Sequence, residues 1–371
     1  MQPATGEPRD HLTADQVRDL IVTQGVGVRG GLEVLDHDRG FVDDVSDALR
    51  AGSVSRDVDA KVHGSLSVDV AQELDWPRIL LAPYMVLSHG GVEARFDLGA
   101  YVPQIPEQPT GQTPALFEVE ADDITARAEV PMLDSVEVDD ATEVIAKVRD
   151  LLDAAGLDHS IDSEAAGKTF DRPKVWPWSE EATTLDVCNE LLAAVGYRRL
   201  WSDWRGRVRS QSAVPAADRA VEWLYDAGDE LLGIVDHATG LAPQRRAPNR
   251  WVFVVGDPER LLIEEGDGQY TVDNVDQGPT SQDARGGWVI PQVVQLDVVD
   301  HDSLVRQGDE HVERALRDAE RVSAPTGPMP LTWHRDVVRL IHPVLGDRKL
   351  LVTGWSLDLI SGRMEQDWRR A

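Results

Sequence analysis

The chain has 371 residues, of which 42% are hydrophobic and 28% charged, with 66 acidic side chains against 37 basic ones. This length allows two or three domains with cores of their own, and the hydrophobic content excludes a disordered chain. The formal net charge of −29 disfavours general binding to nucleic acid or to an anionic membrane, because both need clustered Lys and Arg. An acidic wall would instead repel DNA that passes along it.

Cysteine content and hydropathy indicate the compartment in which the protein folds. The single cysteine, Cys188, excludes an intrachain disulfide framework and a cysteine-based zinc cluster, and its place on the apolar face of a predicted helix indicates a buried core residue. The sequence has no run of 18 apolar residues, and residues 1–12 lack the basic and apolar regions of a signal peptide. We therefore expect a protein made and folded in a cytoplasm, without membrane binding of its own.

The first hundred residues predict one helix followed by antiparallel strands. The helix is expected over residues 12–24, where Thr13 and Gln16 have the spacing of a capping box. Apolar alternation then predicts strands on both sides of the turn 36–40, over 61–70 and 79–87, and on to residue 103. Such a series is typical of an antiparallel barrel or sandwich.

A segment rich in Pro, Gln and Thr, residues 103–114, marks a predicted domain boundary. Beyond it we expect a strand over 116–124 and a helix over 139–156, with Asp140 and Glu143 able to cap the start of the helix and Gly156 able to end it.

Residues 183–211 repeat this design. Thr183 or Thr184 can cap a second helix with one apolar face, Gly196 can stop it, and a strand, a tight turn and a second strand follow. Two helices of one type, each next to strands, predict a small α+β module.

From residue 215 the pattern returns to β. We expect buried strands over 250–256 and 288–299, a helix at about 303–322, a break at 323–330, and a C-terminal hairpin whose turn is 345–349. The predicted fold class is α+β, mainly β. Its parts are an N-terminal helix and first β-barrel-type domain over 1–110, an α+β insertion over 111–214, and a second β-barrel-type domain over 215–371.

Two glycine motifs resemble nucleotide-binding loops, and their context excludes both. Residues 25–30, GVGVRG, match the dinucleotide pattern, but a helix precedes them and a strand follows, which reverses the order that this site requires. Residues 167–169, GKT, resemble the end of a phosphate loop, but Asp162 stands where that loop needs glycine.

Acidic and histidine clusters offer no defined chemistry either. His37 lies between Asp36 and Asp38, and His301 lies between Asp300 and Asp302. Neighbouring residues on a strand point to opposite faces, so solvated turn charges are favoured over a metal site. Glu118 and Glu120 share a strand face, but paired carboxylates are common by chance in so acidic a chain. We therefore predict no catalytic, cofactor-binding or metal-binding residues, no cofactor, and no enzymatic activity.

Eleven tryptophans are more than a chain of this length usually carries, and they include the pairs Trp176/Trp178 and Trp201/Trp204. An aromatic surface could stack on sugars, but the same spacing fits core or interface anchoring, which we favour.

In the order and spacing of its segments, the chain resembles the hub proteins of phage tail tips. Such hubs occur among minor tail proteins of actinobacterial phages and are relatives of the trimeric baseplate hub of contractile-tailed phages. The resemblance rests on segments that together cover most of residues 12–364: 29–46, 53–70, the apolar run 79–87 that precedes 96–103, the helix 139–156 that ends in LLDAAG, 183–210, 247–257 and 336–364.

The resemblance implies two tail-tube-like β-barrel domains with an α+β insertion that packs outside the ring. It implies a structural role in which a homotrimer joins the tail tube and distal tail ring to the tip and forms part of the DNA-ejection channel. The implied partners are the distal tail protein, the tape-measure protein and other minor tail proteins, with DNA only passing through. The implied location is the virion, after assembly in the host cytoplasm.

Two other functions stay open at this stage. One is a host-surface module that binds glycans or degrades the cell wall, although many relatives carry such a role on a long C-terminal extension and this sequence stops soon after its last hairpin. The other is an acidic cytoplasmic interaction protein unrelated to phage.

Overall fold

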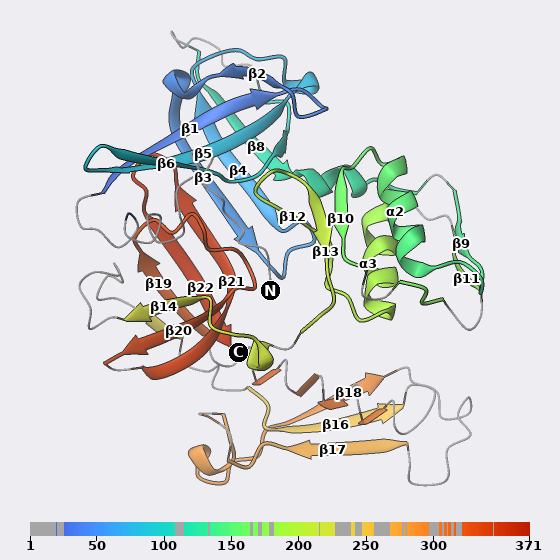
Figure 1. Cartoon of the computed structure of the whole chain (residues 1–371). Helices are drawn as coiled ribbons and strands as arrows, with labels where there is room; N and C mark the ends of the chain where they lie inside the picture. Colours follow the sequence, from blue (N-terminus) through green and yellow to red (C-terminus); the bar gives the residue numbers. More distant parts are fainter. Residues whose placement is uncertain are drawn as a thin grey trace.

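A computed structural model gives the fold of the chain (Figure 1). The residues that it describes are Leu20, 26–107, 115–132, 134–163, 166–169, 173–177, 182–214, 216–226, 239–241, 247–255, 268–276, 278, 280–296, 304–305, 308–309, 311–312, 315–316, 321–343 and 345–371. Of the helix predicted over residues 12–24, only Leu20 belongs to this set. Leu20 is helical and buried in the main core.

The fold is α+β and mainly β, as predicted. The strands are β1 Gly27–Leu35, β2 Phe41–Asp44, β3 Leu49–Asp57, β4 Gly64–Val70, β5 Leu80–His89, β6 Val92–Asp97, β7 Tyr101–Pro103, β8 Phe117–Asp123, β9 Val136–Val138, β10 His159–Ile161, β11 Lys174–Trp176, β12 Trp201–Ser202, β13 Val208–Ser210, β14 Trp223–Asp226, β15 Thr239–Leu241, β16 Arg250–Val255, β17 Gln269–Asp273, β18 Pro291–Leu296, β19 Arg321–Thr326, β20 Val337–His342, β21 Gly346–Asp358 and β22 Met364–Arg370. The helices with described bounds are α2 Val144–Ala154 and α3 Thr184–Ala194, with short 3-10 turns such as η3 Ile124–Ala128.

One large sheet joins the two predicted β regions. Its order is β15-β19-β22-β21-β3-β4-β8-β7-β5-β1-β2, with β6 beside β5 and with β20 and β14 continuing from β21. The joint is the antiparallel pair β21/β3, which runs from Gly354 opposite Asp57 to Asp358 opposite Ser53. Figure 1 shows the strands of the N-terminal region running directly into those of the C-terminal region. The two regions therefore share a sheet and one hydrophobic core.

The strand that follows the Pro-rich segment belongs to this sheet. Sequence patterning assigned it to the insertion, but β8 pairs antiparallel with β4 and with β7. Its apolar residues Phe117, Val119 and Ala121 are buried in the main core, whereas Glu118 and Glu120 are exposed. The first β region thus continues to Asp123 at the end of β8.

The insertion proper packs α2 and α3 together around a core of its own. Thr183 caps α3 through a capping box, with its side chain on the Asp186 amide and the Asp186 carboxylate on the Thr183 amide. Glu143 is the N-cap of α2 but makes no side-chain capping bond, so the predicted capping of α2 by Asp140 and Glu143 is wrong. Gly156 and Gly196 have positive φ after the helices, as the stop prediction requires.

The C-terminal third departs most from the prediction. Strands β17, β16 and β18 form a separate three-stranded sheet with a small core around Trp251 and Phe253. Strand β18 was predicted as buried, but its outer face is open and Val293 is 67% exposed.

The predicted helix at 303–322 is helical at its described residues up to 316. Its predicted end is wrong, because Arg321 and Val322 begin β19, which also covers the first half of the predicted break at 323–330. The hairpin β20/β21 is confirmed, but its predicted turn at 345–349 is wrong, because β21 already begins at Gly346, which pairs with His342. The added strand β22 pairs with both β19 and β21.

Candidate functional site

The described His and Asp residues that the sequence analysis considered as possible metal ligands make hydrogen bonds within the protein. His37, in the β1/β2 turn, contacts Arg127 through Nδ1 and the Pro77 carbonyl through Nε2. Asp36 accepts the backbone N–H groups of Asp38 and Gly40, which closes the turn. His301, with Asp300 and Asp302, lies outside the described residues. In the part of the chain that the structure describes, no group of three or more His, Cys, Asp or Glu side chains is placed to hold a metal ion.

The glycine motif at 25–30 serves close packing. Gly30 lies in β1 against the C-terminal region, where an added Cβ would come 2.1 Å from the Leu359 carbonyl oxygen. In the GKT motif, the Gly167 amide binds the Glu143 carboxylate and the Lys168 carbonyl accepts the Val144 amide, so this segment covers the start of α2. The close backbone approach at Gly30 is typical of a glycine within a sheet.

The described tryptophans of the predicted pairs pack against protein. Trp201 and Trp204 are 5% and 9% exposed and belong to the main core. Trp176 is 8% exposed and donates from Nε1 to the Glu190 carboxylate at 2.7 Å. Trp178 lies outside the described residues. Core anchoring is therefore the observed role for these three side chains. Cys188 is also buried, and burial raises the pKa of its thiol to about 12.

The main polar feature missed at the sequence level is a buried junction centred on Arg56 of β3. The guanidinium donates to the Ser202 carbonyl at 3.0 Å and to the Ser202 hydroxyl at 3.2 Å, and it lies 3.5 Å from the Asp123 carboxylate. It also lies 4.0 Å above the Trp333 ring. Both side chains of the ion pair have 0% exposure. One arginine thus connects the first β region, the insertion hairpin β12/β13 and the C-terminal region.

Two histidines extend this junction. The rings of His63 and His334 meet edge to face at 5.1 Å, and Trp333 lies beside them. Burial lowers the pKa of His63 to about 4. Burial and the neighbouring charges of His63 and Arg56 hold the pKa of His334 well below its ordinary value. Both rings are therefore neutral at pH 7, and protonation of either ring would lower the stability of the junction.

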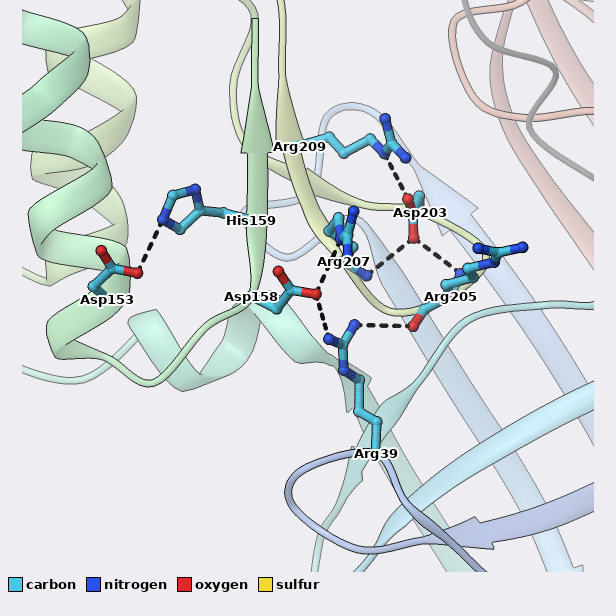
Figure 2. Close-up of polar contacts among 8 residues, drawn as sticks. All are labelled: Arg39, Asp153, Asp158, His159, Asp203, Arg205, Arg207 and Arg209. Carbon is cyan, nitrogen blue, oxygen red and sulfur yellow. Dashed lines mark hydrogen bonds and ion pairs between the residues drawn. The ribbon is translucent and has the colours of Figure 1, made fainter.

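A second polar cluster lies on the β12/β13 hairpin, around the buried carboxylate of Asp203 (Figure 2). The Asp203 carboxylate accepts the backbone amides of Arg205 and Arg207 at 2.9 and 3.0 Å and the Nε of Arg209 at 2.5 Å. Gly206 takes a positive φ of 69° that closes the turn. This arrangement fixes the hairpin and turns the Arg205 and Arg207 side chains toward solvent.

Arg39, from the β1/β2 turn, ties that hairpin to the first β region. Its guanidinium pairs with the Asp158 carboxylate and donates to the Arg205 carbonyl at 3.3 Å. Arg207 reaches the same carboxylate at 3.0 Å. Burial alone would raise the pKa of Asp158, but the hydrogen bonds from Arg39 and Arg207 outweigh it and lower the pKa. Figure 2 shows Asp158 between the two arginines, with His159 beyond it on Asp153.

A groove of about 600 Å³ lies between the β1/β2 turn and this hairpin. The lining combines apolar, acidic and basic side chains: Glu33, Leu35, Asp38, Arg39, Phe41, Ala82, Asp97, Gly99, Ala100, Trp204, Arg205 and Arg207. Two of the lining carboxylates pair with Arg95, Glu33 at 2.7 Å and Asp97 at 3.1 Å. Such a mixed surface is typical of a protein contact, and it has no arranged nucleophile or acid/base pair.

No family model matches the sequence, and no curated protein matches it significantly. None of the described helices is both long and apolar enough to cross a membrane.

Solved structures of phage tail proteins share the fold. The tail protein from Neisseria meningitidis MC58 is 10% identical, with a TM-score of 0.64 over 92% of this chain and 97% of that one. The 43 kDa tail protein of prophage MuSo2 from Shewanella oneidensis is 13% identical, with a TM-score of 0.60 over 92% of this chain and 98% of that one. A prophage tail protein from Listeria monocytogenes EGD-e is 11% identical, with a TM-score of 0.54 over 92% and 94%. The chain therefore has the fold of phage tail proteins across nearly its whole length.

Proposed function

We propose that this chain is the structural hub of a phage tail tip, which joins the tail tube and distal tail ring to the tip and forms part of the DNA-ejection channel. The observation that carries this proposal is the extent of the shared fold. The likeness to the tail protein from Neisseria meningitidis covers 92% of this chain and 97% of that one. It therefore includes both β regions and the insertion, and not a single barrel that many unrelated proteins share.

The sheet shared by the two β regions fits a rigid connector between the tail tube and the tip. A hub that connects a tube to a tip must hold its two β regions at a fixed angle, and the β21/β3 pairing with the buried Arg56 contacts does so here. Three copies, each carrying two tube-like regions, would meet a sixfold tube through a contact that repeats by rotation. The distal tail protein and the tape-measure protein are the partners that such a position implies.

The net charge of −29 suits the same position. DNA that leaves the particle must slide past the channel wall without binding, and an acidic wall repels its phosphates. We propose that the chain is not an enzyme and that DNA is only a passing partner. The rival role as a glycan-binding module loses support from the packed positions of Trp176, Trp201 and Trp204.

The test is location in the particle. An affinity tag after Ala371, in a particle whose gene cluster encodes this chain, should be labelled by gold at the distal end of the tail. Deletion of the gene should leave particles without complete tails. Label on the capsid or along side fibres, or normal tails without the gene, would overturn the proposal. A clearing band on host cell walls, abolished by one carboxylate substitution, would favour the wall-degrading alternative.

A further inference from the structure

The hairpin β5/β6 ends in an exposed tip with a defined shape. His89 pairs with Val92 across the two-residue loop Gly90–Gly91, whose φ values of 59° and 85° are those of a tight hairpin turn. Val92 is 41% exposed. Glu93 is exposed and has no ion-pair partner among the described residues. Figure 1 shows this hairpin extending beyond the rest of the sheet. Because neighbouring residues of a strand point to opposite faces, the tip offers an apolar side chain on one face and an unpaired carboxylate on the other.

The groove beside the insertion hairpin offers the complementary groups. Phe41, which lines the groove, and its neighbour Val42 are 64% and 56% exposed on the edge strand β2. The Arg205 guanidinium stacks on the Trp204 ring at 4.2 Å and has no carboxylate partner among the described residues. The Phe41 ring and the Arg205 charge thus match Val92 and Glu93 of the tip in chemical type.

Tip and groove lie at opposite ends of the same pair of strands. Leu35, which lines the groove, pairs with Leu80, whereas Gly27 pairs with Ser88 next to the tip. Eight residues of extended strand separate these ends by about 27 Å. The tip cannot reach the groove of its own chain, but it can reach the groove of another copy. A contact between two different patches repeats by rotation, and it closes a ring when the rotation per copy is a whole fraction of a full turn.

We propose that the β5/β6 tip of one copy seats in the groove of the next, with Val92 against Phe41 and Glu93 facing Arg205. The occupant of the groove is thus a second copy of this chain, and the contact rests on the proposed function for its ring. Apolar contact would supply the affinity, and the ion pair would select the orientation. Seating the tip would also cover the edge of β2, which is the last strand of the sheet.

Disulfide trapping tests the contact. The full chain with Val92→Cys and Phe41→Cys should form covalent dimers and trimers under mild oxidation. A mixture of the two single variants should give mainly the mixed dimer. The native Cys188 can stay, because burial makes it unreactive. The matched control joins Val92→Cys to Val130→Cys, since Val130 is also exposed, at 51%, but lies outside the groove.

Charge exchange tests the orientation. In the two-cysteine chain, Glu93→Arg or Arg205→Glu should each lower the trimer yield about fivefold, and both together should restore it. Glu118→Arg, at an exposed site elsewhere, should leave the yield unchanged.

The contact would be overturned if, at the highest soluble concentration, the two-cysteine chain gave no more covalent dimer and trimer than the Val130 control. It would also be overturned by charge variants that do not rescue each other. If the chain is found at the tail tip and yet forms no covalent dimers or trimers, the contact of the β5/β6 tip with the groove is wrong and the hub role stands. If the chain forms covalent trimers in high yield but is missing from tails, the contact between copies is supported and the hub role is contradicted.

Discussion

Two arginine–aspartate pairs hold the same insertion hairpin against the rest of the molecule, in opposite surroundings. Arg56 and Asp123 are both 0% exposed, and Arg56 also binds Ser202 at the start of the hairpin. Arg39 and Asp158 are 27% and 37% exposed, and Arg39 binds the carbonyl of Arg205 in the hairpin turn. Removing one partner of a buried pair leaves a charge without compensation, whereas water compensates an exposed one. The buried pair should therefore fix the fold, and the exposed pair should shape a surface.

The largest expected effect breaks the buried pair. Arg56→Met removes the partner of Asp123 and both hydrogen bonds to Ser202, and it should lower the free energy of unfolding by about 3–5 kcal/mol. The matched variant Arg39→Met acts on the exposed pair and should cost about 0–1 kcal/mol. Urea unfolding followed by tryptophan fluorescence measures both. Equal losses in the two variants would contradict the distinction between the pairs.

The packing between the two β regions can be disrupted without changing a charged residue. Gly30→Ala would place a Cβ against the Leu359 carbonyl oxygen, and the forced backbone shift should cost about 1–3 kcal/mol. Gly327→Ala is the control, because nothing lies within 4 Å of the Cβ added there. A loss at Gly30 within about 0.5 kcal/mol of the control would mean that the two regions are not closely packed at this point.

Acid should loosen the buried junction. The folded pKa of His63 is lowered to about 4 from 6.5, so below pH 6.5 the unfolded chain takes up a proton that the folded chain refuses. The stability from this ring is complete above pH 6.5 and is lost as the pH falls toward 4. His63→Gln removes that loss, so the difference in unfolding free energy between wild type and variant should change by about 1.4 kcal/mol per pH unit in this window. A constant difference from pH 7 to pH 4.5 would show that His63 does not titrate on unfolding.

The smallest expected effect concerns the insertion alone. Thr183→Ala removes the capping box of α3 and should cost about 1 kcal/mol. Thr184→Ala, one residue inside the helix, should cost less than about 0.5 kcal/mol. Thermal unfolding by circular dichroism compares them. Two equal losses would mean that the capping bond contributes nothing to stability.

Local features could be predicted from the sequence, because periodicity and capping act between near neighbours. The turn 36–40, the helix stops at Gly156 and Gly196, the burial of Cys188 and the β20/β21 hairpin follow from such signals. Pairings between distant strands leave no periodic trace, so the β21/β3 joint and the place of β8 in the large sheet were not predictable.

The site was harder to predict than the fold. A signal for the burial of Arg56 did exist, since alternation along β3 puts it on the same face as the buried Val54 and the nearby Val58. A charged residue on such a face indicates a buried ion pair. The groove carried no such signal, because Phe41, Arg205 and the β5/β6 tip come from separate turns whose arrangement only the fold determines.

A reconstruction of the intact tail tip tests the hub role most directly. We expect three copies of this chain around the tail axis, with strands of the large sheet lining a channel wide enough for duplex DNA and the insertion on the outside of the ring. Six copies around the axis, or a chain that occurs only in a peripheral fibre and never contacts the channel, would contradict it.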